Sequence, residues 1–130
     1  MIKPNLHELA ELTGVSVAEE GQQQKAVMQI IESGQAEIVI VSLGAAGALS
    51  ATSGGITYWR SPLVPIKSKV GAGDSMVGGL TLSLARGQSL EESIRFGIAC
   101  GAAAVMTAGS ELCRREDAER LFDLVQMTNA

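Results

Sequence analysis

The sequence has few aromatic residues, few cysteines, and no long apolar or basic run. Phe, Trp and Tyr make up 3% of the 130 residues, so the core is not built on large rings. The cysteines, Cys100 and Cys113, lack metal-ligand spacing, and no signal segment is recognisable, which points to a reducing cytoplasm. The longest apolar runs, 38–43 and 98–106, are far shorter than the ~20 residues needed to cross a bilayer.

The charge balance argues against nucleic-acid and anionic-membrane partners. Fourteen acidic and ten basic residues give a net charge of -4, and the basic residues form no run, so a small soluble ligand fits better. A hydrophobic content of 46% is enough for one domain that buries roughly two-thirds of its unfolded surface. No repeat, linker or low-complexity tract appears, and we therefore expect a single domain over 1–130 with no internal boundary.

A glycine-rich turn followed by a helical pattern occupies 69–80, KVGAGDSMVGGL. At the start of this helix the free N–H groups of Gly71, Ala72, Gly73 and Asp74 would meet the positive end of the helix dipole, which suits a phosphate or a phosphoryl group in transfer. A carboxylate in an anion site is unexpected, because its charge repels phosphate. Asp74 therefore either caps the helix or accepts a proton from a nucleophile.

A second candidate site precedes the first predicted helix, where Asn5 and Glu8 have the spacing of a capping box. Leu6, Leu9 and Leu12 give this helix an apolar face, and Gly14 ends it. An amide and a carboxylate at one exposed helix start also suit a hydrated magnesium ion, which takes few protein ligands and several waters. The spacing leaves both interpretations open.

The run 37–43, EIVIVSL, is typical of a strand buried on both faces of a largely parallel sheet. Ser42, Gly44 and Gly47 follow at its carboxyl end, where ligands gather in open α/β sheets, although a plain glycine turn explains them equally well. We expect short edge strands at 48–52, 56–60 and 63–67, and helices at 17–33, 90–105 and 114–126. Gly97 and Gly101 would allow close contact between the helix at 90–105 and a neighbouring element.

Two common phosphate-binding motifs are absent: there is no Gly-x-x-x-x-Gly-Lys-Ser/Thr, and the dinucleotide pattern fails because Met76 replaces its last glycine. Instead, KPNLHE (3–8), SLGAAGA (42–48) and GAGD (71–74), in this order, resemble the motifs of the ribokinase-like (PfkB-type) sugar kinases. The residues at 70–79 and 95–97 look most like those of the 6-phosphofructokinases of that family, with 1-phosphofructokinases and tagatose-6-phosphate kinases as near relatives.

The resemblance implies a three-layer α/β/α ribokinase-like fold, of which this chain is the C-terminal, nucleotide-binding half. It implies an ATP-dependent sugar-phosphate kinase in which Asp74 is the base and the N–H groups from Gly71 to Asp74 form the anion hole. Asn5 and Glu8 match a magnesium motif that acts largely through water. Further implied contacts are Lys3, Ser42, Gly44 and Gly47 for the nucleotide, and Ser68, Val70, Ala104 and Gly109 for a potassium ion.

The resemblance also implies a cytoplasmic enzyme whose full-length form is a homodimer binding ATP and a sugar phosphate. Two residues depart from the family pattern: Lys69 stands where relatives usually carry a small residue, and Glu111 where a basic one is common. The N-terminal half of the family, which holds most sugar contacts, has no counterpart in these 130 residues. A non-catalytic fragment that keeps only the fold is the alternative.

Overall fold

The computed structural model describes residues 1–69, 71–107 and 114–129. The chain divides into two compact units, one made of Met1–Trp59 with Met127–Ala130 and the other of Arg60–Gln126. No linker or change of composition marks this division in the sequence. Val70, Gly109, Glu111 and Cys113 lie outside the described residues, so their expected roles stay predictions.

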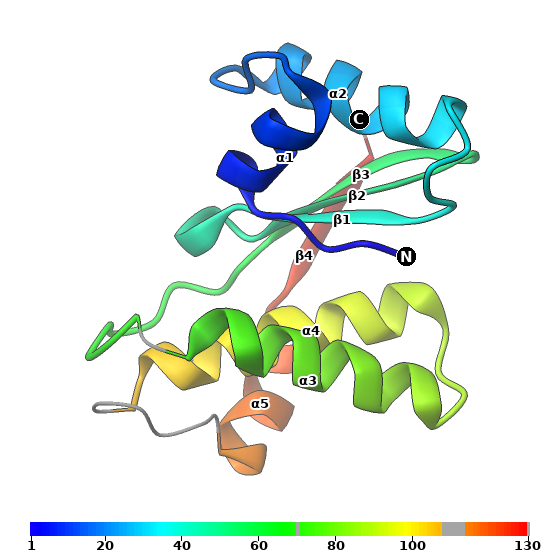
Figure 1. The fold of residues 1–130 in the computed structure, drawn as a ribbon. Coiled ribbons are helices and arrows are strands. Elements are labelled where there is room, and N and C mark those ends of the chain that lie inside the picture. The colour runs from blue at the N-terminus through cyan, green and yellow to red at the C-terminus, as the bar shows by residue number, and fades with distance from the viewer. Residues whose placement is uncertain (70, 108–113, 130) are drawn as a thin grey trace. The chain divides into compact units, whose positions relative to one another are not determined.

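The first unit is a four-stranded sheet with two helices on one face, as Figure 1 shows. The strands follow the order β1-β2-β3-β4 across the sheet. The elements are α1 (Leu6–Thr13), α2 (Glu20–Glu32), β1 (Val39–Ser42), the short 3-10 helix η1 (Gly44–Ala46), β2 (Ala48–Thr52), β3 (Gly55–Arg60) and β4 (Gln126–Asn129).

Helix α1 begins and ends where its sequence signals predict. The Asn5 side chain accepts a hydrogen bond from the Glu8 N–H at 2.8 Å, and Glu8 Oε1 accepts one from the Asn5 N–H at 3.0 Å. Gly14 ends the helix with a φ of 71°, in the left-handed region that glycine adopts without strain. The predicted capping box is thus confirmed, while the predicted apolar face is confirmed only in part: Leu9 is fully buried and Leu6 packs against the core, but Leu12 is exposed.

The expectation of a largely parallel sheet is wrong for the described strands. β1 pairs antiparallel with β2, and β2 pairs antiparallel with β3. The connections between these strands are too short for parallel pairing, because parallel neighbours need a crossover of a dozen or more residues. Parallel pairing occurs at the edge of β1, where Ile2 bridges Val39 and Asn5 bridges Ser42.

The core of the first unit lies between the sheet and its helices. Val39 and Val41 of β1 pack with buried residues of both helices and of β2, the whole cluster being Leu9, Ala26, Val27, Ile30, Val39, Val41, Leu49 and Ala51. Within the sheet, the buried Trp59 Nε1 donates a hydrogen bond of 2.8 Å to Ser50 Oγ. This bond joins β2 to β3 and satisfies a polar group that burial would otherwise leave unpaired.

The second unit consists of α3 (Ala72–Ala85), α4 (Leu90–Val105) and α5 (Arg115–Phe122). Its helices α3 and α4 touch through glycines. A Cβ built on Gly97 would lie 2.9 Å from the Met76 carbonyl oxygen, and one on Gly79 would lie 2.6 Å from Cys100 Sγ. The predicted close approach at Gly97 is therefore confirmed, and it positions the backbone of α3 directly against α4.

Two predicted elements differ from the structure. Residues 63–67 form no strand; Pro65 has no N–H to donate, and the Leu63 side chain is fully exposed. The helix expected over 114–126 ends at Phe122, and Gln126–Asn129 forms β4 instead. β4 is exposed along its whole length, so it carries no apolar alternation that could reveal a strand in the sequence.

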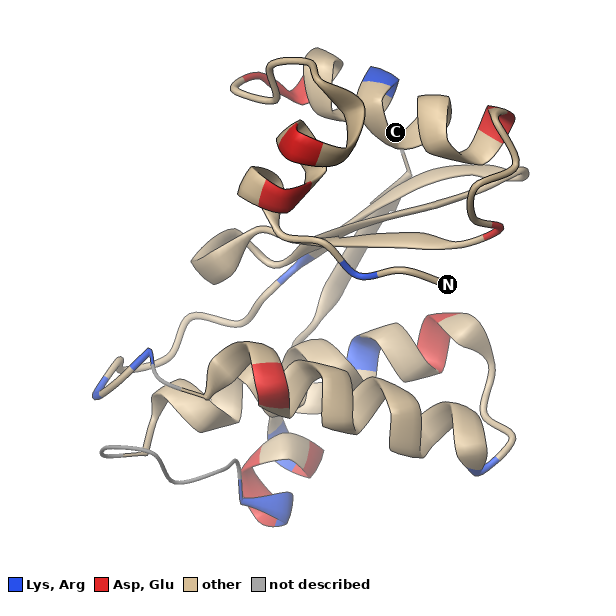
Figure 2. Ribbon diagram, viewed as in Figure 1, with Lys and Arg blue, Asp and Glu red and all other residues tan. Residues whose placement is uncertain are grey.

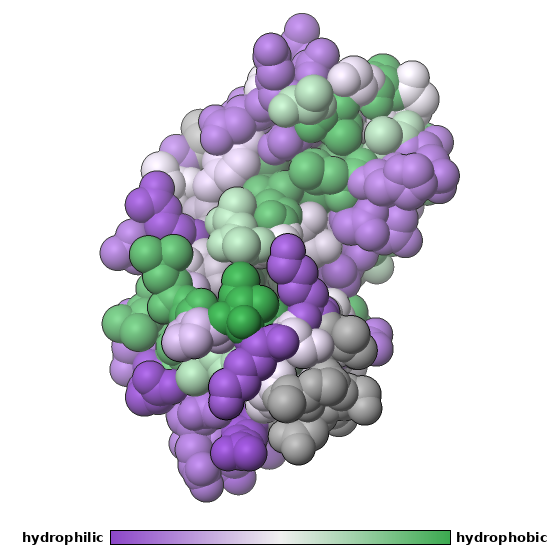
Figure 3. Space-filling view, turned by 90° about the vertical axis from the view of Figure 1, so that its left-hand side faces the viewer, coloured by the Kyte–Doolittle hydropathy of each residue, from purple (hydrophilic) through white to green (hydrophobic). Residues whose placement is uncertain are grey.

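Several large apolar side chains are exposed, among them Leu63 and Ile66 before α3 and Val77 and Leu82 on α3. Figure 3 shows such apolar side chains, in green, on the surface that it draws. Among the described residues, no helix combines the length and the hydropathy that spanning a membrane requires.

Candidate functional site

The structure places the predicted site residues in two groups, one in each compact unit. In the first unit, three backbone hydrogen bonds hold the chain before α1 against β1: Ile2 N–H to Ile38 O, Ile40 N–H to Ile2 O, and Ser42 N–H to Pro4 O, all between 2.9 and 3.0 Å. This pairing brings Lys3 to the carboxyl end of β1, where its Nζ donates a hydrogen bond of 3.3 Å to Ser42 Oγ. Lys3, Asn5 and Ser42 are thus neighbours although 39 positions separate Lys3 from Ser42.

The capping and metal interpretations of Asn5 and Glu8 are compatible in this geometry. The capping box engages Asn5 Oδ1 and Glu8 Oε1. Glu8 is exposed, and neither its Oε2 nor the second lone pair of its Oε1 is needed for the cap. The described residues hold no cluster of three acidic, histidine or cysteine side chains, so a metal here would keep most of its water, as magnesium does.

Glu8 also lines a hollow of about 480 Å³ together with Lys3. The other residues around it are Ile2, Pro4, Glu11 and Leu12. One ammonium and two carboxylates therefore border the same hollow, and Figure 2 marks the acidic positions of α1 in red. Glu11 was not among the predicted site residues; its position three residues after Glu8 was the available signal, because residues three apart share a helix face. Its carboxylate pairs with His7 Nε2 at 3.0 Å.

The segment after Ser42 forms a tight turn. Gly44 and Gly47 have φ values of 61° and 110°, and η1 lies between them. The Leu43 N–H donates to Gly47 O at 2.9 Å, and the Gly47 N–H donates to Gly44 O at 3.1 Å. Both glycines are required by the turn itself, so the turn interpretation is confirmed, while contact with a nucleotide stays a prediction.

In the second unit, the glycine turn opens α3 as predicted. Gly71 is the N-cap, with a φ of 84° and no side-chain cap. The N–H groups of Gly71, Ala72, Gly73 and Asp74 are the four that a helix start leaves without an intrahelical partner. The positive end of the α3 dipole and these four donors form a site suited to an anion.

Asp74 occupies the first turn of α3, but it is not the N-cap residue. Asp74 therefore makes no N-cap hydrogen bond, but an acidic residue in the first turn still stabilises α3 through the helix dipole, so both interpretations of Asp74 stay predictions. The Asp74 side chain is exposed and has no hydrogen-bond or ionic partner among the described residues. An unpaired carboxylate beside free N–H groups is available to accept a proton.

The described part of the predicted potassium site is only partly suited to a cation. The N–H groups of Lys67 and Ser68 both donate to Val105 O, at 2.7 and 3.2 Å, which brings Ser68 to the end of α4 beside Ala104. The Ala104 carbonyl, however, already accepts from the Thr107 N–H at 3.1 Å and from Thr107 Oγ1 at 2.8 Å. These bonds use both lone pairs, so potassium would have to displace one of them.

Gly101 packs against the first turn of α3, which carries the candidate anion site. A Cβ at this position of α4 would lie 3.3 Å from the Ala72 carbonyl oxygen. α4 therefore packs closely against the first turn of α3, the turn that carries the four N–H groups. The spacing of Gly97 and Gly101 predicted a close contact, but the sequence did not indicate which segment would be touched.

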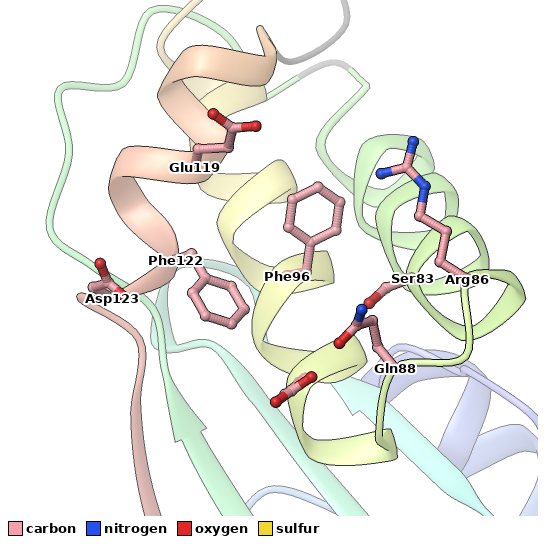
Figure 4. A pocket seen from close by; sticks show the side chains of 8 residues that line it. Ser83, Arg86, Gln88, Phe96, Glu119, Phe122 and Asp123 are labelled. Atoms are coloured by element: carbon pink, nitrogen blue, oxygen red, sulfur yellow. The ribbon is translucent and has the colours of Figure 1, made fainter.

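A second hollow, of about 290 Å³, lies among α3, α4 and α5 (Figure 4). The rings of Phe96 and Phe122 lie there with their centroids 6.5 Å apart and their planes tilted by 54°, and Arg95 Cζ lies 5.6 Å from the Phe122 centroid. Its polar border includes Arg86 and Glu119. None of the predicted site residues that the structure describes lines this hollow.

The fold of these elements is that of the ribokinase-like class. The model of the pfkB family carbohydrate kinase matches residues 1–117, and the chain belongs to this family. It is 43% identical to the ATP-dependent 6-phosphofructokinase isozyme 2 of Escherichia coli K12 over 94% of this chain and 40% of that protein. It is 33% identical to the 1-phosphofructokinase of Bacillus subtilis over 98% of this chain and 41% of that protein.

Solved structures show the same relationship. The chain superimposes on Escherichia coli phosphofructokinase-2 in complex with potassium with a TM-score of 0.89 and 43% identity, over 94% of this chain and 40% of the other. With the Arabidopsis thaliana ribokinase bound to ribose and ATP the TM-score is 0.83, at 27% identity, over 92% of this chain and 39% of that one. These matches confirm the predicted ribokinase-like fold. The chain spans about 40% of the length of these relatives.

Proposed function

We propose that this chain supplies the ATP and magnesium site, the anion hole and the catalytic base of a 6-phosphofructokinase, which converts fructose 6-phosphate to fructose 1,6-bisphosphate. The observation that carries the proposal is the start of α3, where the exposed and unpaired carboxylate of Asp74 stands in the same turn as four free N–H groups. Such a turn binds an anion and accepts a proton at one place, and both are requirements of phosphoryl transfer.

In the proposed reaction, the sugar hydroxyl oxygen forms a bond to the γ-phosphorus while the bond from that phosphorus to the β,γ-bridging oxygen breaks. Asp74 accepts the proton of the attacking hydroxyl, and ADP leaves with the bridging oxygen. The N–H groups of Gly71, Ala72 and Gly73 donate hydrogen bonds to the oxygens of the transferred group, where negative charge is spread in the transition state.

The first unit would hold the nucleotide side of the reaction. Lys3 offers a positive charge to the phosphates at the carboxyl end of β1, close to Asn5 and Glu8. A magnesium ion, when bound through water to Asn5 and Glu8, would neutralise phosphate charge. The turn presents exposed backbone from Gly44 to Ala46 beside Ser42, which is the contact expected for the nucleotide, whereas Gly47 is buried.

The finer parts of the proposal rest on the family resemblance. We propose that the functional enzyme is a cytoplasmic homodimer and that residues 1–130 are the C-terminal part of its kinase domain. A potassium ion near Ser68, Val70, Ala104 and Gly109 would have to compete with Thr107 for the Ala104 carbonyl oxygen.

The test compares this chain alone with a chimera. In the chimera, the part of the Escherichia coli isozyme 2 that precedes the matched stretch is fused to this chain. The chain alone should show only background turnover with ATP, magnesium and fructose 6-phosphate, because nothing holds the sugar hydroxyl at Asp74, and such positioning is worth roughly 7–11 kcal/mol. The chimera should turn over. An inactive chimera that nevertheless folds and binds both substrates would contradict the proposal.

The choice of sugar phosphate has a second candidate. The Escherichia coli 1-phosphofructokinase is 41% identical over 81% of this chain, close to the identity with isozyme 2. Fructose 1-phosphate and tagatose 6-phosphate therefore belong in the same assay. In the chimera the sugar phosphate would be held mainly by the Escherichia coli part. The preference among sugar phosphates therefore tests that part, whereas the use of ATP tests this chain.

A further inference from the structure

Two of the predicted nucleotide contacts, Lys3 and Ser42, are hydrogen-bonded to each other through their side chains. The Ser42 hydroxyl accepts the hydrogen bond of the Lys3 ammonium at 3.3 Å, and both side chains are half-buried. A lysine side chain has several rotatable bonds, and it loses their rotational freedom only where a partner holds the ammonium group. The contact therefore selects one position of the ammonium among many.

The backbone around this contact is fixed independently of it. The Ser42 N–H donates to Pro4 O at 3.0 Å, and Asn5 bridges Ser42 in parallel. Side chains alternate between the faces of a strand, so Ser42 and Ile40 share the face opposite to Val39 and Val41, which pack under the helices. The hydroxyl of Ser42 is thereby held at one place beside the segment that carries Lys3.

We propose that Ser42 is a positioning residue, which holds the Lys3 ammonium at the carboxyl end of β1 for the phosphates of the nucleotide. This inference rests on the proposed function. It differs from the expectation that Ser42 itself contacts the nucleotide, because it assigns the effect of Ser42 to the placement of Lys3. Ligand contact then comes from Lys3 and from the exposed backbone of the turn at Gly44.

The chemistry of the pair makes the inference specific. The ammonium has three N–H donors, and the hydroxyl of Ser42 takes one of them, so two stay free for phosphate oxygens. The serine proton can in turn point away from the ammonium, which keeps the contact favourable whether or not a phosphate is bound. A residue without an acceptor at position 42 would release the lysine, while threonine would keep the hydroxyl and suits the strand.

The first experiment needs no nucleotide. The amines of the 130-residue chain are labelled slowly with an acylating reagent, and the rate at Lys3 is compared by mass spectrometry with that at Lys25, which is exposed on α2. In Ser42→Ala the labelling rate of Lys3 should rise roughly threefold or more relative to Lys25, because the ammonium is no longer held. Ser42→Thr should behave like the unmodified chain. An unchanged ratio in Ser42→Ala would overturn the inference.

The second experiment measures ATP binding by calorimetry in a double-mutant cycle of Ser42→Ala and Lys3→Met. Each single variant should lower affinity roughly threefold to tenfold, and the double variant should be no weaker than Lys3→Met alone, because Ser42 acts only through Lys3. Ser61→Ala, a half-buried serine outside the site, is the matched control and should leave affinity unchanged.

The outcomes separate the two proposals. Additive losses in the cycle would overturn the inference and assign Ser42 a nucleotide contact of its own. Absence of ATP binding by both the unmodified chain and the chimera would overturn the proposed function, and the labelling ratio would still decide whether Ser42 holds Lys3. Adenosine, which has no phosphate, should bind the unmodified chain and Ser42→Ala equally.

Discussion

Gly79 of α3 faces Cys100 of α4 so closely that a Cβ on the glycine would lie 2.6 Å from the cysteine Sγ and 3.3 Å from the Gly97 Cα. A Cβ built on the neighbouring Gly78 would have nothing within 4 Å. Two adjacent glycines in one helix therefore have opposite environments. Gly79 permits the close contact between α3 and α4, and Gly78 has no packing role.

Gly79→Ala should lower the free energy of unfolding by about 1–3 kcal/mol, since the added methyl group would overlap the Cys100 side chain. Gly78→Ala should raise it by about 0.5–1 kcal/mol, because alanine loses less conformational freedom in a helix than glycine does. Chemical denaturation of both variants measures the difference. Equal effects of the two substitutions would contradict the described packing, and Cys100→Ala should partly restore Gly79→Ala.

The hydrogen bond between Trp59 and Ser50 gives a second stability test. Ser50→Ala leaves the indole N–H buried without an acceptor, which should cost about 1–3 kcal/mol. The fluorescence of Trp59, the only tryptophan, reports the loss directly. Ser61→Ala is the control, because it leaves no buried group without a hydrogen-bond partner. If Ser50→Ala lowered the free energy of unfolding no more than this control does, the hydrogen bond would contribute nothing to stability.

Tyr58 gives a prediction for high pH. Burial raises the pKa of Tyr58 above its ordinary value of 10.0, and the negative charge of Glu20 raises it further. Above about pH 10 the unfolded chain loses the phenolic proton while the folded chain keeps it, so stability falls as pH rises through this range. Tyr58 is the only tyrosine, so tyrosinate absorbance follows it alone. Tyr58→Phe should remove this loss; an identical high-pH decline in Tyr58→Phe would assign it to other groups.

The metal role of Glu8 separates from its capping role by substitution. Glu8→Gln keeps an oxygen that can accept the Asn5 N–H, so folding should change by less than about 1 kcal/mol. The negative charge that favours magnesium is lost, so the magnesium concentration needed for half-maximal ATP use should rise. A magnesium titration of the chimera and a thermal melt of the same protein test both statements.

The control for this prediction is Glu91→Gln, which changes an exposed acidic residue in the first turn of α4. It should affect the melt about as much as Glu8→Gln and leave the magnesium response unchanged. A large loss of stability in Glu8→Gln with an unchanged magnesium response would favour a purely capping role.

Local signals in the sequence predicted the local parts of this structure. Asn5 with Glu8 located the start of α1, the run of β-branched residues located β1, and the glycine turn before Asp74 located the start of α3. Each of these depends on residues within one turn or one strand of each other. The fold class followed from the resemblance of the motifs at 3–8, 42–48 and 71–74 to one family.

The parts that were not predicted depend on residues far apart in the chain. β4 is polar and exposed and is a strand only because β3 offers it an edge. The contact of Lys3 with Ser42 needs the parallel pairing of two segments 39 positions apart, and the support of Ala72 by Gly101 needs the packing of α3 on α4. Register and helix packing are set by tertiary contacts, which no single segment encodes.

The central claim is that Asp74 is the base of a phosphoryl transfer, and the most direct measurement compares turnover and ATP affinity of the chimera with those of its Asp74→Asn variant. Asparagine keeps the size of the side chain but cannot take up a proton. The account predicts that turnover falls by at least ~100-fold while ATP affinity changes by no more than a few-fold. An Asp74→Asn variant that keeps most of the turnover would contradict it.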